Sequence, residues 1–433
     1  MLSHVRQFHR DARVFLATTL VVGAALSLYW IDFNLYLASL GYSTATIGLV
    51  ATVGSTAGAL TAFPASALSD RIGRRAVMAS GIVIALLALV GLLLVDALPL
   101  IIVFVALWAI GQQSLMVVQA PFLTEHSAPE HRNELFALQA AIQSVTSVVA
   151  AALGGVVATS LAGVMGIDPN GPGTYRIILV IMALLLTVGL GTMSLLGDDR
   201  PGRLRGAGRL RELGEPAAYP VGPPRTRTLM GVVVRDRSLF IRLLLPGLLI
   251  SIGAGQVIPF LNLFVQHKFG LDLASLNALF AVTSLGTVAA MLAQPALARR
   301  FGQISSVVIV QALSIPFLFV LGFSPILWTV IAAMVVRNSL MNAGNPIFSA
   351  FAMEQVTPAE RATLAAAMSV LWQVGWVVGG AWYALLQATL GIDGGYAVNF
   401  FTVIALYSVA TILYWVWFRA ADRRALAERR SAV

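Results

Sequence analysis

The chain contains no cysteine and very little charge. Without cysteine it forms no disulfide, no thiolate nucleophile and no cysteine-ligated metal or iron–sulfur site. Only 11% of its 433 residues are charged, whereas a soluble domain has about 25%. So few ionic groups do not cover a water-facing surface of this size. We therefore expect lipid to be the solvent for most of the chain.

Lysine is nearly absent as well, and Lys268 is the one example. No glycine-rich phosphate loop accompanies it, which excludes ATP-driven pumping by this chain alone. The five histidines fall in the expected loops and termini, and no nucleophile–base–acid set or metal-ligand cluster occurs at membrane depth. The sequence therefore predicts no enzyme activity, no cofactor and no metal.

Long hydrophobic segments make up most of the chain, and 58% of its residues are hydrophobic. A bilayer-spanning helix needs about 20 apolar residues, and the charge-free segments supply twelve. The predicted spans cover residues 14–38, 46–68, 76–95, 99–123, 135–162, 176–197, 239–265, 273–298, 304–322, 326–353, 362–390 and 397–418. The fold class expected is an all-α polytopic membrane protein.

The positive charge is distributed unevenly over the predicted loops. If the amino terminus is cytoplasmic, 24 of the 28 basic residues lie on the cytoplasmic side. The positive-inside rule then places both termini in the cytoplasm of a cell whose inner membrane the chain spans. The net charge of +9 is explained by topology, so we expect no nucleic-acid partner. The lipid bilayer and a small solute are the expected partners, and the expected state is a monomer.

One segment differs in composition from the rest. Residues 198–237 contain five prolines, six glycines and nine arginines, which is typical of a linker. The predicted organisation is a six-helix bundle over residues 1–197, a basic cytoplasmic linker over 198–237, a second bundle over 238–418 and a basic tail over 419–433.

The two sides of this linker resemble each other at a spacing of 229 residues. The matching pairs are Leu40-Gly41 with Phe269-Gly270, Gly73 with Gly302, Glu125 with Glu354, Pro129 with Pro358, and Arg132 with Arg361. Two parallel repeats joined by a linker are the arrangement in which a substrate site lies between halves that rock around it.

A motif follows the second predicted span. The residues are Ser66-Ala67-Leu68-Ser69-Asp70-Arg71-Ile72-Gly73-Arg74-Arg75. They resemble the Gly-x-x-x-Asp-Arg-x-Gly-Arg-Arg signature of the major facilitator superfamily, and with the twelve spans and the repeat the resemblance covers the whole chain. It implies the fold of that superfamily, with two pseudo-symmetric six-helix bundles.

The resemblance also implies a role for the loop that carries the motif. In the family this loop is a cytoplasmic latch, which assigns Asp70, Arg71, Gly73 and Arg74 to that role. The alternative is that the arginines only retain the loop inside. Matching charges at the inner ends of the fourth and tenth spans are expected gate contacts: Glu125, Arg132, Glu354 and Arg361.

The chain departs from the family's patterns at four places, and the last two departures weaken the likeness to drug antiporters. Ser66 replaces the first glycine of the signature, and Arg299 replaces the acid in the second copy. The Arg-x-x-Gln-Gly pattern linked to proton coupling is missing from the fourth span. The fifth span lacks the glycine–proline step typical of many drug antiporters.

Two charges remain at membrane depth once topology accounts for the others: Asp32 in the first span and Arg337 in the tenth. Ionisable groups are costly there and are functional candidates. Asp32 shares a helix face with Tyr29 and Tyr36. It can accept a proton, bind a cationic substrate or form a structural charge pair with Arg337, and the sequence leaves these alternatives open.

Amides and aromatic residues occupy the predicted cavity helices. Asn338, Asn342 and Asn345 follow one face of the tenth span. Each amide is either a ligand contact or a helix-packing contact, and each aromatic is either a cavity wall or packing. The complete set of cavity candidates is Tyr29, Asn34, Tyr36, Gln112, Gln119, Gln139, Gln143, Gln256, Asn262, Asn338, Asn342, Asn345, Trp372 and Trp376.

The sequence thus predicts a secondary active transporter that exports a small amphipathic organic molecule, coupled to protons, by alternating access. A lipid or lysolipid translocator, a proton-coupled importer and a transport-dead receptor are the alternatives.

Overall fold

All the secondary structure that the computed structural model describes is helical. The model describes residues 10–126, 132–197, 236–357 and 360–431. The helices are α1 (Arg10–Ser39), α2 (Thr44–Ile72), α3 (Arg74–Leu94), α4 (Leu98–Glu125), α5 (Arg132–Met165), α6 (Pro172–Ser194), α8 (Arg237–Val257), the 3-10 turn η4 (Ile258–Phe260), α9 (Leu261–Phe269), α10 (Leu273–Phe301), α11 (Gln303–Phe323), α12 (Leu327–Glu354) and α13 (Arg361–Ser431).

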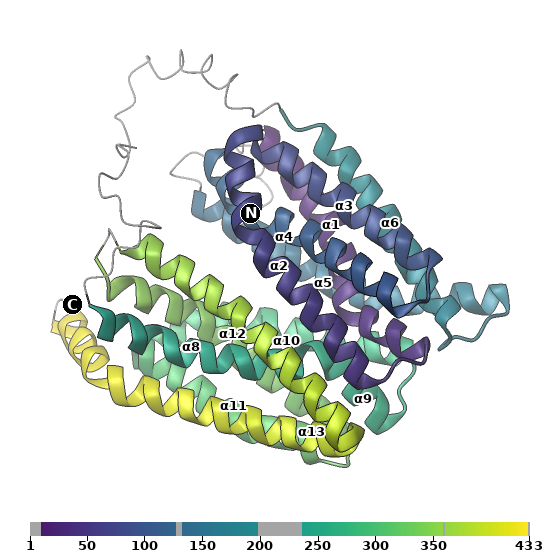
Figure 1. The fold of residues 1–433 in the computed structure, drawn as a ribbon. Helices are drawn as coiled ribbons and strands as arrows, with labels where there is room; N and C mark the ends of the chain where they lie inside the picture. Colours follow the sequence, from purple (N-terminus) through teal and green to yellow (C-terminus); the bar gives the residue numbers. More distant parts are fainter. Residues whose placement is uncertain (1–9, 127–131, 198–235, 358–359, 432–433) are drawn as a thin grey trace.

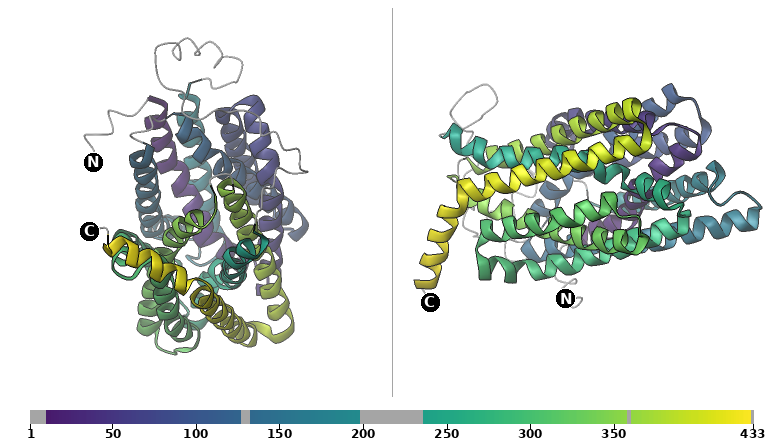
Figure 2. Two further views of the ribbon diagram at one scale, coloured as in Figure 1. Left: turned by 90° about the vertical axis from the view of Figure 1, so that its left-hand side faces the viewer. Right: turned by 90° about the horizontal axis from the view of Figure 1, so that it is seen from below.

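These elements give the twelve predicted spans. The seventh span is divided into α8, η4 and α9, and α13 holds both the eleventh and the twelfth. The predicted loop between the last two was too long, because the chain leaves helical geometry only at Gly391, which has a φ of 70°. The last helix also continues to Ser431, beyond the expected end at residue 418, and projects from the bundle (Figure 2).

The repeat in the sequence corresponds to repeated turns. Gly41 and Gly270 end the first and the seventh span with φ values of 87° and 63°. Gly73 and Gly302 separate α2 from α3 and α10 from α11 with φ values of 99° and 91°. Side chains other than glycine rarely adopt such angles, so the paired glycines produce the same turns in both halves.

The helices gather into two bundles (Figure 1). In the first, α1 packs on α5 and α6, and α3 packs on α4 and α6; in the second, α8 packs on α13 and α11 packs on α12. The bundles meet along two helix pairs, α2 with α13 and α5 with α10. We call this contact the seam. We call the end where α1 and α8 begin the terminal face, and the opposite end the far face.

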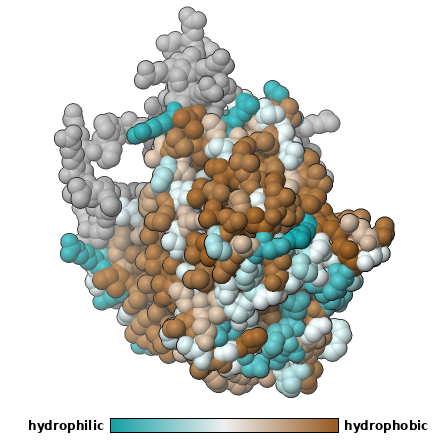
Figure 3. Space-filling model, turned by 45° about the vertical axis from the view of Figure 1, so that its right-hand side comes forward, coloured by the Kyte–Doolittle hydropathy of each residue, from teal (hydrophilic) through white to brown (hydrophobic). Residues whose placement is uncertain are grey.

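Much of the outside of the molecule is apolar. Figure 3 shows a broad hydrophobic surface over the helices, and large side chains such as Leu60, Leu94 and Trp328 are more than 70% exposed. Within the described residues, nine helical segments are long and apolar enough to cross a membrane by length and composition. One of these, Thr363–Ala420, contains two spans. Lipid is the solvent that accommodates this surface.

Small residues bring α8 and α13 into close contact. A Cβ added at Gly255 would lie 2.8 Å from the Cα of Trp376, and one added at Gly379 would lie 2.5 Å from the carbonyl oxygen of Ile252. Gly375 faces Ser251, whose hydroxyl donates to the carbonyl of Trp372 at 2.6 Å. Helices in membranes associate through such small-residue contacts.

This contact predicts the effect of a single methyl group. Gly379→Ala places a Cβ against the backbone of α8, which has no rotamer with which to move aside, so we expect a loss of about 1 to 3 kcal/mol in the free energy of unfolding. The control is Gly191→Ala in α6, where a Cβ meets nothing within 4 Å. Thermal unfolding of the purified variants is the measurement, and equal melting temperatures for both would contradict the packing described.

Candidate functional site

Polar contacts across the seam lie mainly towards the far face. The amide of Asn262 donates to the carbonyl of Ile31 at 2.5 Å, and the amide of Asn34 donates to the carbonyl of Pro259. Thr44 donates to Gln387 at 3.1 Å. The turn between α8 and α9 thus supplies one backbone acceptor to α1, and α1 supplies one to α9. These contacts hold the far side closed.

Asp32 lies in this closed region and is 2% exposed. Its Oδ1 accepts a hydrogen bond from Nδ2 of Asn277 in α10 at 2.8 Å, so the carboxyl group links the two bundles. Its Oδ2 has no hydrogen-bond partner in the described part of the chain, and neither does Oδ1 of Asn277. Gly155 in α5 provides the space, since a Cβ there would lie 2.9 Å from the Cβ of Asn277.

Arg337 is also buried, but it contacts other groups. Its Nη1 donates to Oδ1 of Asn338 at 2.9 Å, and its Nη2 donates to the hydroxyl of Tyr407 in α13 at 3.1 Å. The guanidinium lies 5.7 Å from the centre of the Tyr407 ring. In this conformation Asp32 and Arg337 therefore form no ion pair, and each is hydrogen-bonded to neutral groups instead.

A polar cavity lies at mid-depth on the seam. It has a volume of about 430 Å³ and is bounded by α5, α10 and α12. Eight of its ten lining residues carry a hydroxyl or an amide, and none is ionisable: Gln143, Ser144, Ser147, Thr283, Ser284, Thr287, Asn338 and Asn342, with Ala140 and Phe280.

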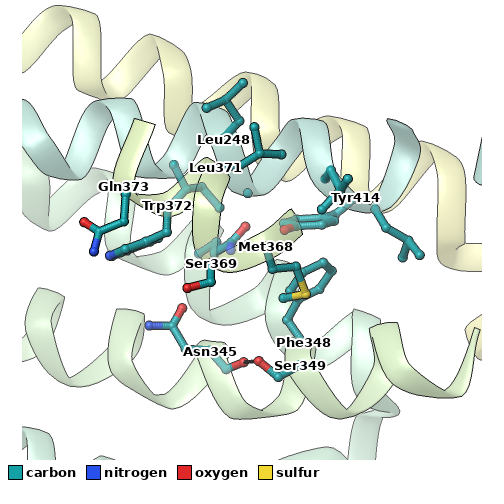
Figure 4. A pocket seen from close by; sticks show the side chains of 16 residues that line it. Leu248, Asn345, Phe348, Ser349, Met368, Ser369, Leu371, Trp372, Gln373 and Tyr414 are labelled. Carbon is teal, nitrogen blue, oxygen red and sulfur yellow. Dashed lines mark hydrogen bonds between the residues drawn. The ribbon is translucent and has the colours of Figure 1, made fainter. Parts of the chain in front are cut away.

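A second cavity of about 340 Å³ lies nearer the terminal face, between α8, α11, α12 and α13 (Figure 4). Its walls are mainly apolar and aromatic, with Phe348, Met368, Trp372 and Tyr414 around it. Asn345 and Ser369 also line it, and both are exposed.

The structure places five of the predicted cavity residues in these cavities. Gln143, Asn338 and Asn342 line the polar cavity, and Trp372 and Asn345 line the apolar one. Trp376 packs edge-on against Trp30 at 5.5 Å across the seam. Gln112 is half-buried in α4 and lines neither cavity.

Other candidates pack within or between the bundles. The hydroxyl of Tyr36 donates to the carbonyl of Leu92 at 3.1 Å, and Tyr29 stacks on Trp108 at 4.4 Å. Gln139 donates to Gln119 at 2.9 Å. Two more, Asn34 and Asn262, are seam contacts, and Gln256 is buried with its Oε1 unpaired among the described residues.

The predicted latch residues form a contact within the first bundle. Nη2 of Arg74 lies 3.2 Å from Oε1 of Glu125, which joins α3 to α4. At the matching place in the second bundle, Nε2 of Gln303 donates to Oε1 of Glu354 at 3.1 Å. Arg71 is exposed. The side chains of Asp70, Arg132 and Arg361 lie outside the described part.

The chain matches the family model described as Major Facilitator Superfamily over residues 15–380. The chain belongs to the major facilitator superfamily. It is therefore a multi-pass membrane protein and a secondary transporter of a small solute, not an enzyme. A search of curated proteins found no match.

Solved structures of superfamily members share this fold. A D-xylose–proton symporter is 12% identical with a TM-score of 0.71, covering 93% of this chain and 97% of its own. The nucleoside transporter NupG is 13% identical with a TM-score of 0.68, at 95% and 99% coverage. A bacterial homologue of the human lysosomal transporter Spinster, inward-facing and occupied, is 14% identical with a TM-score of 0.67, at 94% and 96% coverage.

Sequence reasoning missed the partners of both buried charges. Asn277 lies on α10 and Tyr407 on α13, and no spacing in the sequence pairs either residue with a charge on another helix. The hydroxyls of α10 were missed too, although Thr283, Ser284 and Thr287 recur at helical spacing. That spacing is the signal that was available for the polar cavity.

The contact of Arg337 predicts a difference between two tyrosines of α13. Tyr407→Phe leaves a buried guanidinium with one fewer partner, and we expect a loss of about 1.5 to 3 kcal/mol in stability. Tyr414→Phe is the control, because Tyr414 is equally buried and its hydroxyl has no hydrogen-bond partner among the described residues. Thermal unfolding compares them, and similar melting temperatures would show that the hydrogen bond is dispensable.

Proposed function

We propose that this member of the superfamily exports a small amphipathic organic molecule across the cytoplasmic membrane, coupled to protons. Asp32 carries the proposal, because it is a buried carboxyl group without a counter-ion in the described part and it links the two bundles through Asn277. Removing a carboxylate from water disfavours its charged form. A proton at this position changes the contact that holds the far side closed.

The positions of the seam contacts and of the cavities, relative to the far and terminal faces, support alternating access. Three seam contacts cluster at the far face, whereas both cavities lie at mid-depth or nearer the terminal face. The positive-inside rule assigns the terminal face to the cytoplasm. In that orientation the chain is closed to the outside, and its cavities receive solute from the cytoplasm.

Neutral cavity walls support an organic solute. The two cavities combine hydroxyls, amides and aromatic rings, and no described carboxylate, imidazole, ammonium or guanidinium group lines either one. Small inorganic ions require charged or densely polar ligands, whereas an organic molecule with apolar and polar parts fits these surfaces.

Asp32→Asn tests the coupling. Asparagine can still accept the hydrogen bond from Asn277, so the variant folds, but it cannot take up a proton. In proteoliposomes loaded with a pH-sensitive dye and exposed to a panel of amphipathic compounds, we expect the wild type to move protons opposite to the compound. The variant is expected to lose proton movement and to retain counterflow of the same compound.

The control for this test is Asp393→Asn, which removes an acid whose side chain is 95% exposed. It is expected to behave as the wild type. Proton movement in the same direction as the compound would identify an importer. Proton movement that persists in Asp32→Asn would remove Asp32 from the coupling.

A disulfide across the seam tests alternating access. The built Cβ of Gly380 in α13 lies 3.8 Å from the Cβ of Thr52 in α2, which is the mean separation of about 3.8 Å in disulfides. Because the chain has no cysteine, Thr52→Cys with Gly380→Cys creates a unique pair. We expect oxidation to stop counterflow and a reductant to restore it, with either single variant as the control. Full counterflow in the oxidised double variant would contradict motion at the seam.

A further inference from the structure

The two cavities differ in chemistry but share one helix. Asn338 and Asn342 of α12 line the polar cavity, and Asn345, on the same face, lines the apolar one. Seven residues of helix separate Asn338 from Asn345, or about 10 Å at 1.5 Å per residue. A single molecule of modest length is therefore long enough to extend from one of these asparagines to the other.

We propose that the two cavities form one divided site for an amphiphile that has an uncharged head rich in hydrogen-bond donors and an apolar tail. The head occupies the polar cavity and the tail occupies the apolar one. Binding at this divided site is independent of the proposed function. Only the transport that follows binding rests on it.

A head rich in hydrogen-bond donors is inferred from the hydrogen bonds that side chains lining the polar cavity already donate. The hydroxyls of Thr283, Ser284 and Thr287 donate to carbonyls of their own helix, at 2.9, 2.9 and 3.2 Å. The amide of Asn342 likewise donates to the carbonyl of Asn338 at 2.9 Å. What these groups present to the cavity is oxygen with free lone pairs. A polyol or a primary amide supplies the matching donors.

The absence of charge on the head follows from the lining. None of the described residues that line the two cavities carries a carboxylate, imidazole, ammonium or guanidinium group. Arg337 lines neither cavity, and its guanidinium donates to Asn338 and Tyr407. A charged head would lose its hydration here without gaining an ion pair, which costs more than burying a hydroxyl that finds an acceptor.

The tail site has apolar walls and one polar edge. Phe348, Met368 and Tyr414 surround it, as Figure 4 shows. At the polar edge, Nε2 of Gln373 donates to Oε1 of Gln113 in α4 of the other bundle at 3.4 Å. The apolar cavity therefore also borders the first bundle, as the polar cavity does through α5.

Gly247 provides a way to fill the tail site alone. A Cβ built on it has one neighbour within 4 Å, the hydroxyl of Tyr414 at 3.9 Å, so there is space for a side chain at this position in the cavity lining. Gly247→Leu is the principal variant. Met368→Trp fills the same cavity from α13 and is the second variant, used if the first does not fold.

The experiment measures equilibrium binding of radiolabelled alkyl β-glucosides, from methyl to octyl, to the full chain in nanodiscs. Dialysis fixes the free aqueous concentration, and empty nanodiscs are subtracted. In the wild type we expect affinity to rise about threefold to fourfold for each added methylene. Gly247→Leu is expected to remove this dependence and to leave the methyl glucoside unaffected.

The head is tested with Asn342→Leu, which removes an acceptor from the polar cavity. We expect it to weaken methyl and octyl glucoside by the same factor, about tenfold. Gly191→Leu in α6, where a Cβ meets nothing within 4 Å, is the matched control and is expected to change neither.

Two results would overturn the proposal. The first is that affinity rises with alkyl-chain length in both Gly247→Leu and Met368→Trp as steeply as in the wild type. The second is tighter binding of octyltrimethylammonium than of octyl glucoside by the wild type. Binding is measured without a pH gradient, so a failure of proton coupling leaves these results unchanged. Conversely, coupled transport with no chain-length dependence would reject the divided site and leave the proposed function standing.

Discussion

The free-energy cost of removing charged groups from water constrains the structure of this protein. The chain carries 11% charged residues, and the two that remain deep between its helices are held by neutral partners. Asp32 accepts one hydrogen bond from Asn277, and Arg337 donates to Tyr407 and Asn338. An arrangement with an unpaired buried carboxyl oxygen persists only if the surrounding packing enforces it. Here the same packing closes the far side of the seam.

That packing depends on backbones that approach each other closely. The hydrophobic effect does not drive helices together in lipid, so van der Waals contact has to do so. Gly155 gives Asn277 the room to reach Asp32, and Gly379 lets α13 lie against α8. The polar link and the glycine contacts are therefore one structural unit, in which loosening the helices would also separate the amide from the acid.

The fold was largely predictable from sequence. The long charge-free segments, the positions of the arginines and the internal repeat each indicate the membrane topology. The site was predictable only in part. The asparagines of α12 were recognised by their spacing and line both cavities, whereas Tyr36 shares a face with Asp32 but bonds to Leu92 inside its own bundle. Spacing identifies which residues share a face, and the tilt of each helix decides what that face meets. Asn277 was invisible for that reason.

The matching turns at Gly73 and Gly302 carry different chemistry on the same geometry. In one bundle the residue after the glycine is Arg74, bonded to Glu125; in the other it is Gln303, bonded to Glu354. A cation and a neutral amide thus serve equally as the donor that ties one helix start to its neighbour's end. In both copies the residue after the glycine donates a hydrogen bond to a glutamate, although only one of the two donors is charged. The two halves of the repeat therefore share the hydrogen bond and not the charge of its donor.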